Sequence, residues 1–167
     1  MLKSTGIPTK EDLQKIYPSA ERLAKGPVAI IECFQRIPCN PCATACTRGA
    51  ILPFQDINNQ PQLDAEQCTG CALCVASCPG LAVFVVDMTY SEQEALIKLP
   101  YEYLPLPRVN TTVKALNRAG EVVGQGTVIR VQTPPAFDRT AVIHLAVAKT
   151  VAHEVRNIVV EDEANDA

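Results

Sequence analysis

Cysteine is the residue type in this chain with the clearest chemical potential, since the 167-residue sequence holds eight cysteines and only two histidines. The cysteines form two groups of four: Cys33, Cys39, Cys42 and Cys46, then Cys68, Cys71, Cys74 and Cys78. The N-terminus shows no apolar segment followed by a small-residue cleavage site. We therefore expect a cytoplasmic protein in which thiols stay reduced. Clustered, reduced cysteines predict metal binding rather than disulfides.

The two groups are copies of one module. The second reads C-x2-C-x2-C-x3-C-P and ends at Cys78-Pro79. Three pairs of cysteines are offset by 32 residues between the copies, whereas Cys33 and Cys68 are offset by 35, so the first copy has three extra residues within Phe34–Pro38. Three cysteines at intervals of three wrap a tight loop whose sulfurs converge on one compact cube. The fourth lies one helical turn further on and points toward a second centre.

Zinc is the alternative to an iron–sulfur cluster. Zinc sites favour two C-x2-C pairs separated by a dozen or more residues, with four ligands closing on one ion. A duplicated C-x2-C-x2-C-x3-C arrangement suits a cube better than a tetrahedron. The spacing therefore favours iron and sulfur, and zinc stays open as the second reading.

Residues 68–79 resemble the signature of the two-[4Fe-4S] bacterial-type ferredoxin family, with Gly70 inside the loop. The first copy departs from that signature in its long first gap and in Thr47, where the family has proline. The resemblance covers about residues 28–88. It implies two [4Fe-4S] clusters with crossed ligation, because the fourth cysteine of each run ligates the other cluster in such ferredoxins. The implied ligands are Cys33, Cys39, Cys42 and Cys78 for the first cluster, and Cys68, Cys71, Cys74 and Cys46 for the second.

The sequence patterns around these ligands predict an α+β protein. We expect a helical N-terminal extension at residues 1–27 and a two-cluster ferredoxin-like domain at 28–90. A small β-rich domain, barrel or sandwich, should follow at 95–160, before an acidic tail at 161–167. The prolines and alternating apolar residues of the third part indicate a docking surface.

Several local patterns support this division of the chain into parts. Val28–Glu32 and Leu81–Met88 predict strands on either side of the cysteines, and Ile97, Leu99, Tyr101 and Tyr103 predict one side of a further strand. Thr9 and Asp12 are typical of a helix capping box. Gly124-Gln125-Gly126 predicts a turn or bulge between strands, and Lys149–Arg156 predicts a helical stretch.

Other function classes are disfavoured. His144 and His153 belong to no cysteine or carboxylate motif, and Gly124-x-Gly126 lacks the third glycine of a dinucleotide loop, so we expect no catalysis by this chain alone. A net charge of −3 argues against nucleic acid as a partner. No apolar run has the length of a membrane span.

The expected function is electron transfer within a hetero-oligomeric complex. Val28–Cys46 and Pro100–Pro107 resemble the small iron–sulfur subunits of FAD-dependent amine or imino acid dehydrogenases of anaerobic bacteria, which include proline- and hydroxyproline-oxidising systems. That resemblance implies a flavin-containing subunit that oxidises the substrate, while this chain relays electrons to another cofactor or acceptor and meets further redox subunits. The alternatives are a subunit of a hydrogenase or 2-oxoacid oxidoreductase, a free ferredoxin, or a non-redox module held together by metal.

Overall fold

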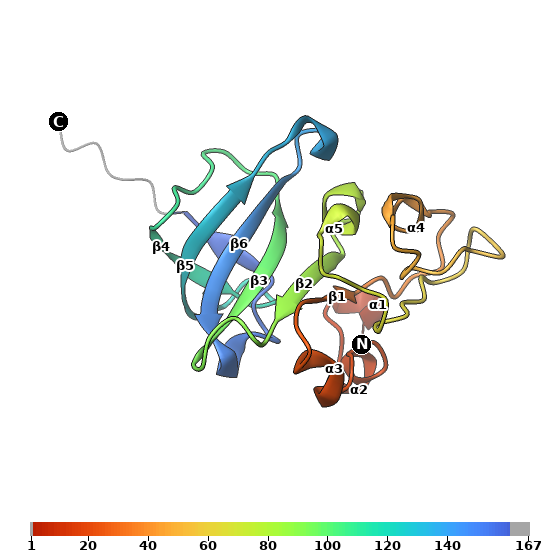
Figure 1. The fold of residues 1–167 in the computed structure, drawn as a ribbon, viewed down its shortest axis with the longest axis horizontal. Coiled ribbons are helices and arrows are strands. Elements are labelled where there is room, and N and C mark those ends of the chain that lie inside the picture. The colour runs from red at the N-terminus through yellow and green to blue at the C-terminus, as the bar shows by residue number, and fades with distance from the viewer. Residues whose placement is uncertain (1, 161–167) are drawn as a thin grey trace.

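A computed structural model of the chain describes residues 2–160, and the predicted acidic tail lies outside the described residues. The strands form one sheet of seven, in the order β1-β2-β3-β6-β5-β4-β7, and every paired neighbour is antiparallel (Figure 1). The strands are β1 (Val28–Ile31), β2 (Val83–Asp87), β3 (Glu94–Tyr101), β4 (Thr112–Leu116), β5 (Val122–Gln132), β6 (Ala141–Ala148) and β7 (Asn157–Val159).

The helices are short. They are α1 (Leu2–Thr5), α2 (Lys10–Gln14), α3 (Ala20–Leu23), α4 (Pro41–Ala45) and α5 (Leu73–Ser77), with 3-10 turns η1 (Pro135–Phe137) and η2 (Lys149–Val151). The predicted capping box is confirmed at α2, where the Asp12 amide donates to Thr9 Oγ1 and the Thr9 amide donates to Asp12 Oδ2. None of the helices in residues 2–160 has the length and apolar character that crossing a membrane requires.

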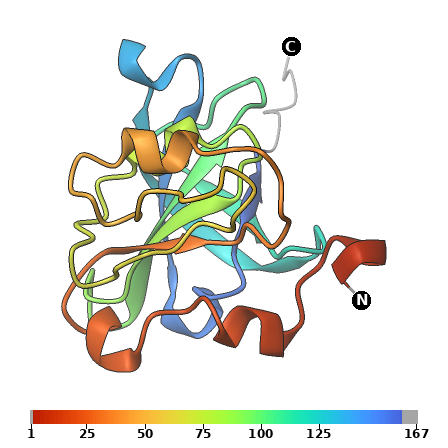
Figure 2. The same cartoon turned by 90° about the vertical axis from the view of Figure 1, so that its right-hand side faces the viewer.

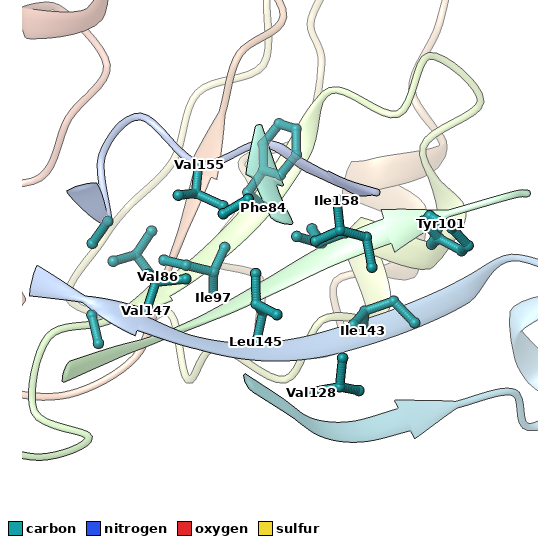
Figure 3. Packing of buried hydrophobic residues seen from close by; sticks show 14 of the residues in the cluster. Phe84, Val86, Ile97, Tyr101, Val128, Ile143, Leu145, Val147, Val155 and Ile158 are labelled. Atoms are coloured by element: carbon teal, nitrogen blue, oxygen red, sulfur yellow. The ribbon is translucent and has the colours of Figure 1, made fainter. Parts of the chain in front are cut away.

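One face of the sheet encloses the larger hydrophobic core (Figure 3). All seven strands contribute to it, among them Ile30 of β1, Ile97 of β3, Leu145 of β6 and Ile158 of β7. Successive side chains of a strand point to opposite faces, so the alternating apolar residues of β3 supply this core from one side only. Because residues of both edge strands reach the same core, the sheet is curled like an incomplete barrel.

The opposite face of β1 and β2 is also buried. Ala29, Ile31, Val83 and Val85 belong to a second core, which includes six of the eight cysteines and residues of α5. This explains why both strands are apolar at nearly every position. Helices α4 and α5 lie outside the curled sheet, on the side of β1 and β2, as two perpendicular views show (Figures 1 and 2).

The sheet continues across the predicted boundary between residues 90 and 95. Strands β2 and β3 form a hairpin there, in which Val86 pairs with Ile97 and Asp87 with Leu96. The strands that support the cysteines and those of the C-terminal part therefore belong to one hydrogen-bonded sheet. The division of the chain into domains stays a prediction.

Two local expectations are wrong, and a third is correct in part. Strand β5 continues through Gly124 and Gly126, so no turn separates two strands there, but its pairing with β4 shifts register next to Gly124, as at a bulge. A Cβ at Gly126 would lie 2.7 Å from Leu145 Cγ, so glycine here makes room for a core side chain. The expected helix near the C-terminus is only the turn η2, followed by irregular chain. Strand β3 ends at Tyr101, and Tyr103 is 65% exposed beyond it.

Candidate metal centres

The eight cysteines line two separate hollows. One, here called site 1, is lined by Cys33, Cys39, Cys42 and Cys78. The other, site 2, is lined by Cys46, Cys68, Cys71 and Cys74. With their open mouths included, the hollows measure about 380 and 350 Å³. The structure thus brings together the two sets of four that the family resemblance implies, and ligation of a cluster by each set is a proposal taken up below.

Helices α4 and α5 produce the exchange between the two sets. Cys42 lies within α4 and faces site 1, whereas Cys46 caps the C-terminus of the same helix and faces site 2. The second copy is arranged in the reverse sense, with Cys74 inside α5 at site 2 and Cys78 at its C-cap beside site 1. Both capping cysteines have extended backbone, which directs the chain away from the helix. Each helix therefore contributes to both sites.

The two sites share one floor. Ile31 and Val83 pair across β1 and β2 and line site 1, while Ala29 and Val85 pair further along the same strands and line site 2. The two floor pairs are two residues apart along each strand. At the rise of an antiparallel strand, this is a step of roughly 7 Å. The sites consequently lie side by side on a rigid, buried support.

Backbone amides point at the sulfurs. At site 2, Ala29 N and Gly70 N lie 3.3 and 3.4 Å from Cys68 Sγ, and Ile51 N lies 3.5 Å from Cys46 Sγ. At site 1, Ala82 N lies 3.4 Å from Cys78 Sγ. Ile51 lies five residues after Cys46 and Ala82 four residues after Cys78, so in both copies an amide shortly after the helix contacts the thiol at its C-terminus. N–H donors directed at sulfur favour the thiolate that a metal requires.

The loop of the second copy depends on glycine. Gly70 has φ +65°, and a Cβ there would lie 2.5 Å from Pro27 Cβ. Ala72 follows with φ +70° as the N-cap of α5. Two left-handed residues in three positions wrap the backbone tightly around site 2. Gly70 therefore serves both the turn and the close approach of the N-terminal segment.

Burial disfavours the ionised form of several thiols and so raises their pKa. It raises the pKa of Cys42 to about 11 and that of Cys74 to about 12, and neighbouring thiols add to the shift in both cases. Burial also raises the pKa of Cys33, with smaller contributions from Cys78 and Cys39. Metal binding at these positions must displace protons, and the bond energy of the metal then becomes part of the folding energy.

The donor sets fit iron–sulfur clusters. Each hollow combines four thiols with a lining that is otherwise mostly apolar. Within residues 2–160, no three His, Cys, Asp or Glu side chains lie close enough together to hold a single metal ion. The thiols of each set line a space and do not close on a point.

Two cations lie beside site 2 that the sequence did not single out. Arg22 of α3 is only 6% exposed, and its guanidinium donates to the carbonyl oxygen of Cys68 at 2.7 Å. Lys98 of β3 donates from Nζ to the carbonyl oxygen of Gly70, also at 2.7 Å. Arg22 lies on a short helix, and Lys98 lies between the buried apolar residues of an alternating strand. No local signal distinguishes them, because their partners are distant in sequence.

A buried ion-pair network joins the cysteine-bearing part of the chain to the rest of the sheet. Glu32, next to Cys33, accepts hydrogen bonds from Arg118 and from Arg156, the latter at 2.7 Å. Burial would raise the pKa of Glu32, but the two arginines outweigh it and hold that pKa below its usual range. Arg156 also donates to the hydroxyl oxygen of Tyr17, so the N-terminal segment is part of the network.

Neither histidine takes part in the sites. His144 lies on β6, is 7% exposed and donates from Nε2 to Gln132 Oε1 at 2.7 Å. Burial, followed by Lys98 and Arg130, lowers its pKa to about 4, so this ring is neutral at pH 7. His153 packs edge-on against Tyr17.

The comparisons with known proteins concern the cysteine-bearing part. Residues 35–82 match the family described as 4Fe-4S dicluster domain, a range that contains every cysteine except Cys33. This part of the chain is therefore similar to 4Fe-4S dicluster domains. Among curated proteins, the chain is similar to "Ferredoxin-type protein NapF" of Escherichia coli strains K12, O6:H1 and O157:H7. The identity in each case is 36% over 52 residues, 30% of this chain and 32% of the relative. The match thus spans about a third of those relatives, and no solved structure matches.

Proposed function

We propose that this chain is the electron-transfer subunit of an oxidoreductase complex. In this proposal it holds two [4Fe-4S] clusters at sites 1 and 2 and relays electrons from a flavin-containing dehydrogenase subunit, which oxidises an amine or imino acid, to another cofactor or acceptor. A [4Fe-4S] cluster exchanges one electron at a time, so two of them let a chain accept a pair of electrons singly. Catalysis of substrate oxidation then belongs to the partner.

The observation that carries the proposal is the common floor of the two sites. The two sets of four thiols line hollows whose floors are neighbouring residue pairs of the same strands, β1 and β2. The pairs are Ile31 with Val83 and Ala29 with Val85. A rigid support that keeps two redox centres adjacent and partly shielded from water is what a short electron relay requires. The family match over residues 35–82 supports the same reading.

An apolar rim at site 1 supports the role of a subunit rather than a free carrier. Ile37 and Ile57 are exposed, and Ile37 lines site 1 itself. The loop of Ile57 is attached to the site, since its carbonyl oxygen accepts from the Cys39 amide at 3.2 Å. We assign the flavin-containing subunit to this rim, because covering apolar surface next to a redox centre brings two cofactors close and excludes water between them.

Anaerobic purification of the tagged full-length chain from its native host tests the proposal. We expect cluster absorbance, about eight iron atoms per chain, and a co-eluting subunit with flavin bands that bleach when an amine or imino acid is added. A partner with nickel or thiamine diphosphate would favour a hydrogenase or a 2-oxoacid oxidoreductase. A brown protein without a partner would indicate a free ferredoxin, and stoichiometric zinc would overturn the redox function.

A pair of variants tests the assigned rim. Ile57→Asp should reduce recovery of the flavin subunit at least tenfold while the iron content stays unchanged, since the loop carries no cysteine between residues 52 and 62. Val122→Asp is the matched control, because Val122 is similarly exposed but lies at the start of β5. Equal recovery with both variants would remove the rim from the interface.

A further inference from the structure

The two sites share their backbone design but differ in the charges around them. Beside site 2, Arg22 is buried and donates to four carbonyl oxygens, those of Ala65, Gly26, Pro27 and Cys68, at 2.6 to 3.1 Å. No carboxylate is among these partners. The guanidinium charge is therefore solvated by neutral dipoles, and it remains a net positive charge within the low-dielectric surroundings of site 2.

Lys98 adds a second charge on the same side. Its ammonium group is half-buried and donates to the carbonyl oxygen of Gly70, the residue before Cys71. Burial lowers the pKa of Lys98, and the Cys71 thiol, followed by Asp87, opposes that shift. The hydrogen bond to Gly70, at 2.7 Å, places the ammonium beside the loop that carries Cys71.

Site 1 has no equivalent. No charged side chain lines this hollow. The nearest ionised group along the chain is Glu32, which is engaged with Arg118 and Arg156. Arg118 and Arg156 are buried near this part of the chain, but both contact Glu32, and Arg156 lies over Phe84 of the larger core, on the other face of the sheet. Neither arginine donates to a carbonyl oxygen of a site 1 ligand.

Rim charges do not separate the sites. Each has one exposed arginine at its edge: Arg48 lines site 2, and Arg36 donates to Asn59 beside site 1. Exposed charges are strongly screened, so this pair has little effect and nearly cancels. Amide donors to sulfur are more numerous at site 2, where Ala29, Gly70 and Ile51 donate, than at site 1, where Ala82 donates. These donors act in the same direction as Arg22 and Lys98, so substitution of the two cations is what separates the effect of charge from that of the backbone.

We propose that Arg22 and Lys98 give site 2 a higher reduction potential than site 1, so that an electron delivered to the chain comes to rest at site 2. The inference rests on the proposed function, because it requires a cluster at each site. A nearby positive charge stabilises the more negative, reduced state of a cluster, and net charge is one of the factors that set its potential. Site 2 also includes Cys71, the one exposed cysteine. An electron acceptor can therefore approach the reduced site.

A redox titration of the anaerobically purified full-length chain, followed by electron paramagnetic resonance, tests the proposal. The wild-type chain should show two midpoint potentials. In Lys98→Met the upper midpoint should move to a more negative value while the lower one stays in place. Lys98→Arg, which keeps the charge, should restore the wild-type value. Arg48→Gln should shift the upper midpoint less than Lys98→Met does, since Arg48 is exposed.

A second variant guards against a purely structural effect. Arg22→Met removes the other charge but also four hydrogen bonds, so its iron content is measured first. With both clusters retained, it should lower the same midpoint as Lys98→Met. A shift of the lower midpoint, an equal shift of both, or no shift would overturn the inference and leave the relay function intact. A chain without two clusters would overturn the proposed function as well.

Discussion

The cysteine segment (residues 33–82) and the curled sheet (β1–β7) are stabilised in different ways. The cysteine segment has little regular structure, namely the five-residue helices α4 and α5 and a single bridge between Ile51 and Leu63. Its core includes six of the eight cysteines. The sheet instead buries apolar side chains from every strand. The comparison teaches that the sheet has a core of its own, whereas the proposed clusters would hold together the distant loops of the cysteine segment.

The largest expected effect is the loss of one site. Cys78→Ala should abolish the cluster of site 1 and spare most of that at site 2, because Cys78 lines site 1 although it belongs to the second copy. Cys46→Ala is the reciprocal control and should remove site 2. Iron content and electron paramagnetic resonance measure both, and far-ultraviolet circular dichroism should still report the sheet. Loss of the same cluster in both variants would contradict the crossed arrangement.

The junction between the two regions should respond next most strongly. Glu32→Gln keeps the shape of the side chain but leaves Arg118 and Arg156 buried without their carboxylate. Breaking a buried pair in this way typically costs about 3–5 kcal/mol. Chemical denaturation at pH 7 measures the change in the free energy of unfolding.

The matched control for the junction is Glu66→Gln. The side chains of Glu66 and its partner Lys25 are 62% and 61% exposed. Their pair should contribute less than about 1 kcal/mol. Similar losses in the two variants would mean that the network does not tie the regions together.

A change confined to the sheet should leave the cysteine segment untouched. Gly126→Ala places a Cβ 2.7–2.8 Å from three atoms of the fully buried Leu145. Overpacking of this kind costs about 1–3 kcal/mol. In Gly124→Ala the nearest atom is Val151 Cγ2 at 3.9 Å, an ordinary contact, so stability should hardly change. Thermal denaturation separates the two variants, and a loss of iron from Gly126→Ala would show that the regions are coupled more closely than we infer.

The smallest effect concerns pH. His144 has its pKa lowered to about 4, so between about pH 6.5 and pH 4 the unfolded chain binds a proton that the folded chain excludes. Stability should therefore fall as the pH falls through this window, by at most about 2 kcal/mol between pH 7 and pH 5. His144→Gln should remove that part of the pH dependence. An unchanged slope in the variant would assign the acid sensitivity to other groups, such as Glu32.

Much of the cysteine segment was predictable because its information is local. The intervals between cysteines set the loops, and the duplication indicated two sites before any fold was known. Capping at Thr9 and the apolar runs of β1 and β2 were equally local. Strand β5 was not predictable, because two glycines in a short segment usually mark a turn, and the reason for Gly126 is a leucine on the neighbouring strand.

The sequence by itself determined which residues are able to hold metal and that they come as two matched sets of four. Only the tertiary structure decided the charges around them. Arg22 is 46 residues from Cys68 and Lys98 is 28 residues from Gly70, yet both lie within hydrogen-bond distance of the site 2 loop. Ligand spacing is a property of the chain over a few residues, whereas an electrostatic environment is a sum over everything that folding brings near. The sequence therefore indicates the kind of chemistry, whereas the difference in charge between the two sites is seen only in the fold.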